Sequence, residues 1–227
     1  MVSGVFAPGI FVFKWHVCNV QEDLMGKTFN MAVDKPERMD MEHMLQLKEI
    51  FLAPYIQIST ALIGKARFAG GNMFRHQMDT LGILIDYGYI DPILLKAALV
   101  HDVIEDLPDF DPEIIRNADS DGEEVLKLVM EVTKQKGQLK ADYIKGIIAN
   151  GSHKAKVLKC ADRISNMISL GFVTSAEFIE RYCDETEHYI FPLAIEVDYN
   201  MYMEILNLVM SRRAYLEESG YFDRKED

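Results

Sequence analysis

Four side chains that can take part in acid, base or metal chemistry stand together in the stretch LVHDVIED at residues 99–106. They are His101, Asp102, Glu105 and Asp106. On a continuous α-helix, residues four apart share a face, so His101 lies beside Glu105 and Asp102 beside Asp106. Carboxylates crowded in this way repel one another unless a cation or protons intervene. His101 and Asp102 could therefore bind one divalent metal ion, and the two acids of the next turn could reach the same space without binding it.

A solvated acidic helix end with a packed histidine would also account for this stretch. Carboxylates at a helix C-terminus oppose the helix dipole, so stability alone would favour Lys or Arg there. The spacing leaves both interpretations open, and further residues are needed to choose between them.

Two residues far from this stretch could complete a site. His76 lies where a glycine-rich turn meets a helical run, although a lone histidine in such a place is more often structural. Asp162 lies inside an apolar helix, and a buried acid needs a partner. Either Lys159 or Arg163 pairs with it at the surface, or it points into a site. Asn166 follows one turn later on the same face.

The elements that would position these residues are helical. The chain has 227 residues, of which 49% are hydrophobic and only 10% aromatic, and apolar residues recur at spacings of three and four. We predict an all-α helical bundle in which residues 41–227 form one domain and residues 1–40 an N-terminal extension of undetermined structure. The predicted helical segments cover residues 44–68 with a break at Pro54, 76–88, 91–106, 122–134 and 154–170, then a helix with a Thr174/Glu177 capping box and long helices to about Tyr215.

Charge and cysteine content exclude several classes of function. The net charge is −12, so no general field attracts nucleic acid or anionic lipid. An apolar stretch at residues 5–20 is interrupted by proline, lysine and histidine, and we do not expect it to be a membrane span or a signal peptide. We expect a cytoplasmic protein without a nucleic-acid or membrane partner, and an oligomer stays possible. Three widely spaced cysteines without a CxxC motif fit a reducing compartment: Cys18, Cys160 and Cys183.

The candidate residues occur in an order that resembles a known family. A histidine is followed 25 residues later by an HD pair and 60 residues after that by a lone aspartate, as in HD-domain metal-dependent phosphohydrolases. Four flanking motifs resemble the hydrolase domain of the RelA/SpoT alarmone family, and the resemblance covers about residues 60–195. These motifs are HDVIED at 101–106, EVTK at 131–134, VLKCADRISNM at 157–167 and ETEHYIFPLA at 185–194.

The resemblance implies an HD-domain helical bundle with one Mn²⁺ ion, and mixed imidazole and carboxylate ligands also suit Fe²⁺ or another divalent ion. It implies that Glu105 and Asp106 orient or deprotonate the attacking water. The metal ligands that it implies are His76, His101, Asp102 and Asp162.

The same resemblance implies contacts to a nucleotide. Arg67 would pack on the guanine base, Asn166 would contact the sugar region, and Ser169 stands near a substrate-contacting hydroxyl. Lys65, with Arg75 and Arg163, is a candidate to supply charge for the phosphates. The sequence departs from the family pattern at four positions, which are Phe68, Ala69 and Ile168, where charged or polar residues are common, and Gln77, where a proline is usual.

Three hypotheses of function follow from this resemblance. The first is a Mn²⁺-dependent hydrolase that removes the 3′-pyrophosphate from guanosine tetraphosphate (ppGpp) or pentaphosphate. The second keeps the metal chemistry but takes another nucleotide or a phosphomonoester as substrate, in line with the departures at Phe68, Ala69 and Ile168. The third is a non-catalytic module that binds a nucleotide.

Overall fold

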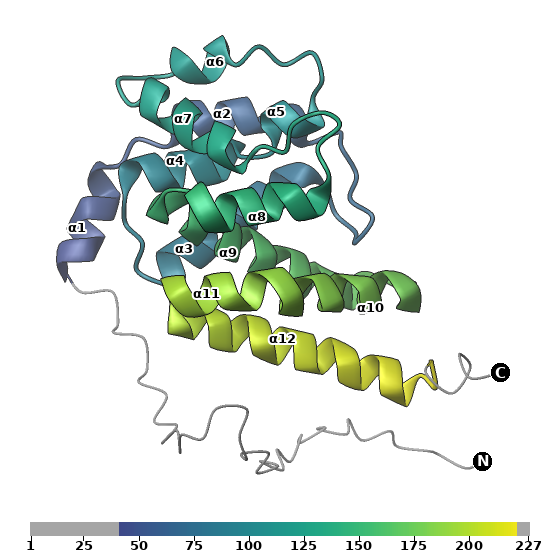
Figure 1. Cartoon of the computed structure of the whole chain (residues 1–227). Helices are drawn as coiled ribbons and strands as arrows, with labels where there is room; N and C mark the ends of the chain where they lie inside the picture. Colours follow the sequence, from purple (N-terminus) through teal and green to yellow (C-terminus); the bar gives the residue numbers. More distant parts are fainter. Residues whose placement is uncertain (1–40, 222–227) are drawn as a thin grey trace, which may run out of the picture. The chain divides into compact units, whose positions relative to one another are not determined.

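The computed structural model describes residues 41–221, and all regular elements within that range are helices (Figure 1). The prediction of an all-α fold is confirmed. The predicted extension at residues 1–40, with Cys18, lies outside the described residues. The helices are α1 (Met41–Glu49), α2 (Ala53–Ser59), η1 (Thr60–Leu62), α3 (Met73–Asp86), α4 (Pro92–Val100), α5 (Val103–Asp106), α6 (Glu113–Arg116), α7 (Gly122–Val132), α8 (Lys140–Asn150), α9 (His153–Ser169), η2 (Leu170–Phe172), α10 (Ala176–Glu185), the π-helical turn η3 (Thr186–Ile190), α11 (Phe191–Val197) and α12 (Tyr199–Glu218).

Helices α4 and α9 form the centre of the bundle. α9 packs against α3, α7, α11 and α12, while α4 packs against α2, α3 and α7. Every residue from 94 to 100 in α4 is buried, as expected for a helix that is apolar apart from Lys96, whose ammonium pairs with Asp119 and Asp121 at 2.6 Å. Leu99 of α4 and Ile164 of α9 are fully buried in this core. Residues that precede or follow these two helices are therefore attached to the buried centre of the bundle.

Local signals set most helix ends. Asn72 caps α3 by accepting a hydrogen bond from the Arg75 amide at 2.9 Å, so the helix begins at Met73, earlier than the predicted start at His76. Asp91 caps α4 in the same way and at the predicted place. The predicted capping box at Thr174 is wrong, because Ser175 is the residue that caps α10.

The predicted continuous helix over residues 91–106 is also wrong. α4 ends at Val100, His101 and Asp102 form a turn, and α5 begins at Val103. The His101 ring lies with Nδ1 2.8 Å from the Ala98 carbonyl oxygen, which is the acceptor that the Asp102 amide would use in an uninterrupted helix. His101 and Asp102 keep right-handed backbone dihedrals, and the Asp106 amide donates to the Asp102 backbone oxygen at 2.8 Å, so the interruption is confined to the link between α4 and α5.

A buried ion pair joins α9 to the end of α10. Arg163 is 2% exposed, and its guanidinium lies 2.6 Å from the Glu185 carboxylate. It also donates to the Thr186 hydroxyl at 3.0 Å and stacks over the Tyr182 ring. The Lys140 ammonium contacts the second Glu185 oxygen at 2.9 Å. Arg163 is thus a structural residue, and the prediction that it could supply charge for a phosphate finds no support in its contacts.

Two remaining sequence expectations can be compared with the described part of the chain. Cys160 and Cys183 are buried free thiols. Among the helices of residues 41–221, none combines the length and the apolar character that crossing a membrane requires.

The Arg163–Glu185 pair leads to a stability prediction. Burial acts to raise the pKa of Glu185, but Arg163 and Lys140 hold it below its ordinary value. Glu185→Gln should lower the free energy of unfolding by about 3 kcal/mol at pH 7, because a buried guanidinium loses its counter-charge. The stabilisation by ionised Glu185 is complete above the ordinary glutamate pKa and is lost as pH falls through the lowered pKa. The difference in unfolding free energy between wild type and Glu185→Gln should therefore narrow below about pH 4.

Urea unfolding at pH 7 and under acid conditions measures both effects. Glu113→Gln is the matched control, because Glu113 pairs with Arg116 at an exposed position. A Glu185→Gln protein as stable as wild type at pH 7 would contradict the prediction.

Candidate metal centre

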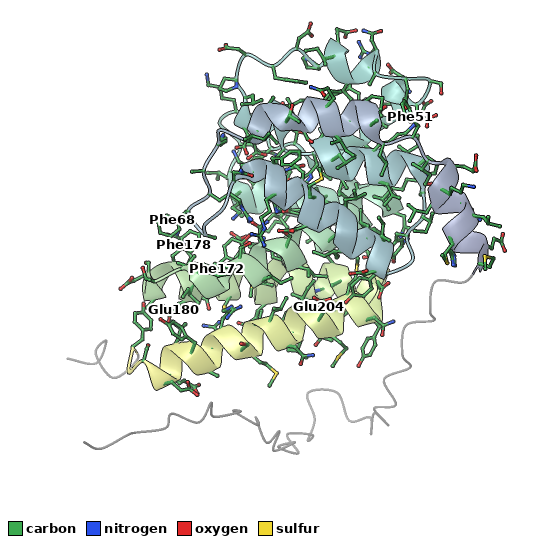
Figure 2. All side chains as sticks on the ribbon, turned by 180° about the vertical axis from the view of Figure 1, so that it is seen from behind. Phe51, Phe68, Phe172, Phe178, Glu180 and Glu204 are labelled. Carbon is green, nitrogen blue, oxygen red and sulfur yellow. The ribbon has the colours of Figure 1, made fainter. Side chains whose placement is uncertain are left out.

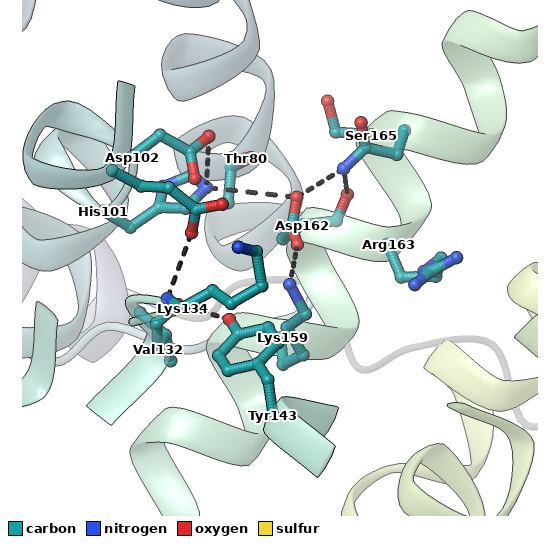
Figure 3. Close-up of polar contacts among 12 residues, drawn as sticks. Thr80, His101, Asp102, Val132, Lys134, Tyr143, Lys159, Asp162, Arg163 and Ser165 are labelled. Carbon is teal, nitrogen blue, oxygen red and sulfur yellow. Dashed lines mark hydrogen bonds and ion pairs between the residues drawn. The ribbon is translucent and has the colours of Figure 1, made fainter. Parts of the chain in front are cut away.

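His76, His101 and Asp162 come together from three separate segments of the chain. One ligand atom from each lies within 4.8 Å of the others, and all three residues are buried. His76 comes from the first turns of α3, His101 from the turn after α4, and Asp162 from the middle of α9. Figure 3 shows Asp162 facing His101 and Asp102 across the site. The arrangement could hold one metal ion.

Asp102 is the fourth predicted ligand and also reaches the two histidines. Its Oδ2 atom lies 3.2 Å from His101 Nε2 and 3.4 Å from His76 Nε2. On the other side, Asp162 Oδ1 lies 3.1 Å from His76 Nε2 and 3.9 Å from His101 Nε2. The structure therefore brings together all four residues that the sequence analysis named as ligands.

In both imidazole rings Nδ1 is engaged by a neighbouring group, so Nε2 is available for a metal ion. His101 Nδ1 lies 2.8 Å from the Ala98 carbonyl, which can only accept, so the neutral ring carries its proton on Nδ1. Its Nε2 is buried and has no hydrogen-bond partner among the described residues. His76 Nδ1 lies 2.8 Å from the Ser165 hydroxyl. Two imidazole nitrogens and two carboxylates fit a divalent ion such as Mn²⁺ or Fe²⁺, so the residues present suit the implied metal.

The charges of the cluster are strongly coupled. Burial disfavours the charged form of His76, but hydrogen bonds and charges from Asp102 and Asp162 raise its pKa to about 9. Burial likewise acts to raise the pKa of Asp102, yet His101 and His76 hold it far below its ordinary value. Two ionised carboxylates in a buried space need positive charge nearby, and either protons on the imidazoles or a divalent cation can supply it.

Asp162 has further partners on its own helix. Lys159 Nζ lies 2.7 Å from Asp162 Oδ2 and stacks over the Tyr143 ring (Figure 3). Asn166 donates its amide to the Asp162 carboxylate and, at 2.9 Å, to its backbone oxygen. Of the alternatives that the sequence left open, Asp162 therefore pairs with Lys159 and also faces the site, while Arg163 pairs elsewhere. The Lys159 pair is buried, so it is not the surface pair that was expected.

Two residues around the cluster were not identified as part of it from the sequence. Ser165 lies three residues from Asp162, and this helical spacing could have indicated it. Gln77, whose Nε2 donates to Asp102 Oδ2 at 3.0 Å, gave no such signal. A glutamine beside a histidine has no pattern that distinguishes a buried partner from a solvated side chain.

The two predicted catalytic acids contact groups other than the imidazole rings. Glu105 accepts a hydrogen bond from the Lys134 amide at 3.1 Å and is exposed. Asp106 pairs with Lys65, whose Nζ lies 2.6 Å from its carboxylate and 2.7 Å from its backbone oxygen. Lys65, predicted to bind substrate, is therefore occupied by Asp106 in this structure.

The predicted nucleotide contacts meet at the end of α9. Arg67 donates to Asn166 Oδ1 at 2.7 Å and to the Ser169 hydroxyl at 3.0 Å. The Asn166 amide therefore contacts Asp162 through its nitrogen and Arg67 through its oxygen. The structure brings these residues together although Arg67 is about a hundred positions away in the sequence.

A cavity of about 220 Å³ opens beside Arg67. The departures Ala69 and Ile168 are among its walls, while Phe68 packs on Phe178 with ring centroids 4.9 Å apart (Figure 2). A larger hollow of about 720 Å³ follows the outer side of α7, but it contains none of the predicted site residues. The cavity beside Arg67 is lined by Arg67, Ala69, Gly70, Gly71, Arg75, Asp79, Ile168, Ser169 and Phe172.

Comparison with solved structures gives a clear fold likeness. The chain resembles a metazoan ortholog of SpoT that hydrolyzes ppGpp and plays a role in starvation responses, with 23% sequence identity and a TM-score of 0.57. The match covers 76% of this chain and 96% of that one. No protein-family model and no curated protein matches the sequence. The fold expected from the sequence resemblance is therefore confirmed.

The cluster predicts metal binding that depends on Asp102. Titration of metal-free protein with Mn²⁺ should raise the melting temperature, because an ion that binds only the folded state stabilises it. Asp102→Ala should weaken Mn²⁺ binding at least about 100-fold, as one anionic ligand is lost, while circular dichroism stays helical.

Asp109→Ala serves as the control, because it removes an exposed carboxylate close to Asp102 in the sequence. Calorimetric titration measures the affinities. Equal Mn²⁺ affinity in Asp102→Ala and wild type would show that Asp102 is not a ligand.

Proposed function

We propose that this protein is a metal-dependent phosphohydrolase that removes the 3′-pyrophosphate from ppGpp or a similar nucleotide. The observation that carries the proposal is the convergence of two imidazole Nε2 atoms and two carboxylates, with His101 Nε2 buried and making no hydrogen bond to the residues of 41–221. The likeness of the fold to a ppGpp hydrolase supports the substrate class.

His76, His101, Asp102 and Asp162 would hold one divalent ion, for which Mn²⁺ is the first candidate and Fe²⁺ the second. When bound, such an ion makes water more acidic and draws charge from a phosphoryl oxygen. With Nε2 turned to the ion, His76 Nδ1–H would donate to the Ser165 hydroxyl oxygen, and Lys159 donates to Asp162; these two hydrogen bonds would keep both ligands oriented.

Glu105 and Asp106 are the proposed acceptors of the proton from the attacking water. Their contacts suggest different roles, since Asp106 is held by the Lys65 ammonium at 2.6 Å whereas Glu105 contacts only a backbone amide among the described residues. A carboxylate bound by one amide keeps free lone pairs to orient water and take its proton. We assign the proton transfer to Glu105 and the positioning of Lys65, which would face the phosphates, to Asp106.

The nucleoside would lie in the cavity beside Arg67. The Arg67 guanidinium offers a flat cationic surface on which an aromatic base can stack. Asn166 and Ser169 hold it in place and would contact the sugar region of the nucleotide. Because Asn166 also holds Asp162, the nucleoside and the metal ligand would be separated by a single side chain.

A second candidate keeps the metal chemistry but changes the substrate to another nucleotide or a phosphomonoester. The apolar part of the cavity favours it, since Ala69, Ile168 and Phe172 offer no charge to a second diphosphate group. Arg67 and Arg75 are the cations that line this cavity. A ligand with an uncharged distal end would lose less hydration there than one with two diphosphates.

A substrate panel distinguishes the candidates. Protein loaded with Mn²⁺ is incubated with ppGpp, NADPH, nucleoside triphosphates and simple monoesters, and released pyrophosphate and phosphate are measured. Pyrophosphate from ppGpp alone is the expected result. Turnover of another compound in its place would favour the second candidate, and tight binding without turnover would indicate a non-catalytic nucleotide-binding module.

Glu105→Gln should reduce kcat by about 100-fold or more, because the amide cannot accept a proton from water. The affinity for Mn²⁺ should stay within about twofold of wild type, because Glu105 contacts the Lys134 amide and not the histidines. Steady-state kinetics with parallel metal titration measures both quantities, with Glu131→Gln on the exposed end of α7 as the control. Full activity of Glu105→Gln would remove the role assigned to it.

A further inference from the structure

Gln77 is a fully buried side chain that is only half satisfied. Its exposure is 0%, and its Nε2 donates to Asp102 Oδ2 at 3.0 Å. Its Oε1 is buried and has no hydrogen-bond partner among the described residues. An unpaired buried acceptor costs stability, so an apolar side chain of similar size would suit this position in the core better.

The charge of Asp102 determines which way the Gln77 amide points. An ionised carboxylate can only accept hydrogen bonds, so the NH₂ group must face it and the carbonyl must face away. Reversing the amide would place its oxygen against the carboxylate and leave both groups worse paired. The unpaired Oε1 is thus the direct consequence of the hydrogen bond that Asp102 receives.

The two aspartates of the cluster are supported unequally. Asp162 is held by the Lys159 ammonium and the Asn166 amide. Apart from the two histidines, Gln77 is the one side chain within residues 41–221 that contacts the Asp102 carboxylate. Asp102 lies at the N-cap of the short helix α5, whereas Asp162 lies in the middle of α9. Apart from the histidines, the orientation of the Asp102 carboxylate therefore depends on Gln77.

We propose that Gln77 is a positioning residue for metal binding. Its hydrogen bond directs Asp102 Oδ2 toward the two imidazole Nε2 atoms, and the fold accepts an unpaired acceptor in exchange for that orientation. This inference rests on the proposed function, since it concerns the ion that Asp102 would bind. A group that orients a ligand without touching the ion typically changes metal affinity about 10- to 100-fold.

Gln77→Met tests the proposal, because methionine keeps a similar length and has neither the donor nor the unpaired oxygen. The metal-free variant should melt at the same temperature as wild type or higher. Its affinity for Mn²⁺, measured by calorimetric titration, should fall about 10- to 100-fold. A residue that serves only the packing of the core would give the opposite pattern, with lower stability and unchanged affinity.

Thr80→Val is the matched control. Thr80 lies on the same helix and is equally buried, but its hydroxyl donates to the His76 backbone oxygen at 2.9 Å and not to a carboxylate of the cluster. This variant should bind Mn²⁺ as wild type does. Gln77→Leu provides a second apolar variant if the Gln77→Met protein does not fold.

The outcomes distinguish failure of the proposed function from failure of the role assigned to Gln77. If wild type itself binds no Mn²⁺, the proposed function fails. If wild type and Gln77→Met bind Mn²⁺ equally, or if Thr80→Val loses as much affinity as Gln77→Met, the role of Gln77 is overturned while the metal centre stands. The role of Gln77 would also be overturned if the free energy of unfolding of the metal-free Gln77→Met protein fell by as much as its free energy of Mn²⁺ binding.

Discussion

The arrangement of this protein depends on keeping two carboxylates ionised in a buried space. Asp102 and Asp162 face the same pair of imidazoles, and neither could stay charged there without nearby positive charge. Lys159 supplies part of this positive charge to Asp162 from the preceding turn of α9, and the remainder must come from protons or from a cation. A fold that only needed stability would have placed apolar groups at these positions, so the cluster is most simply understood as a site.

Helix α9 connects this site with the rest of the bundle. One turn of it carries Asp162 toward the histidines, while the adjacent Arg163 points the other way into the buried pair with Glu185. The same helix ends beside the cavity, where Ser169 contacts Arg67. A candidate metal ligand, a structural ion pair and part of the cavity wall thus lie on one helix, which packs most closely against α3, α7, α11 and α12. Pre-organisation of this kind lowers the cost of holding ligands in place when an ion binds.

Much of this could be predicted from the sequence, and the failures have physical reasons. Helical spacing and the order of His76, the HD pair and Asp162 predicted the all-α fold and the residues that converge. The break after Val100 was missed because it arises from a side-chain contact between His101 and a carbonyl, which residue patterns do not reveal. Gln77 was noted only as a departure from the family pattern, because its role depends on a hydrogen bond to Asp102, which lies 25 positions away. Short-range rules identify elements, but contacts across the core decide which polar groups have partners.

The amide of Asn166 has a consequence for how ligands would communicate. It accepts from Arg67 with its oxygen and donates to Asp162 with its nitrogen, so a single orientation of the amide satisfies both contacts. A molecule in the cavity that pulls Arg67 away from Asn166 would break the hydrogen bond between them, and the Asn166 amide could then rotate. Because coupling free energies are reciprocal, whatever occupancy of the cavity does to the affinity of the cluster, occupancy of the cluster does equally to the cavity. Two ligands that never touch would in this way sense each other through one side chain.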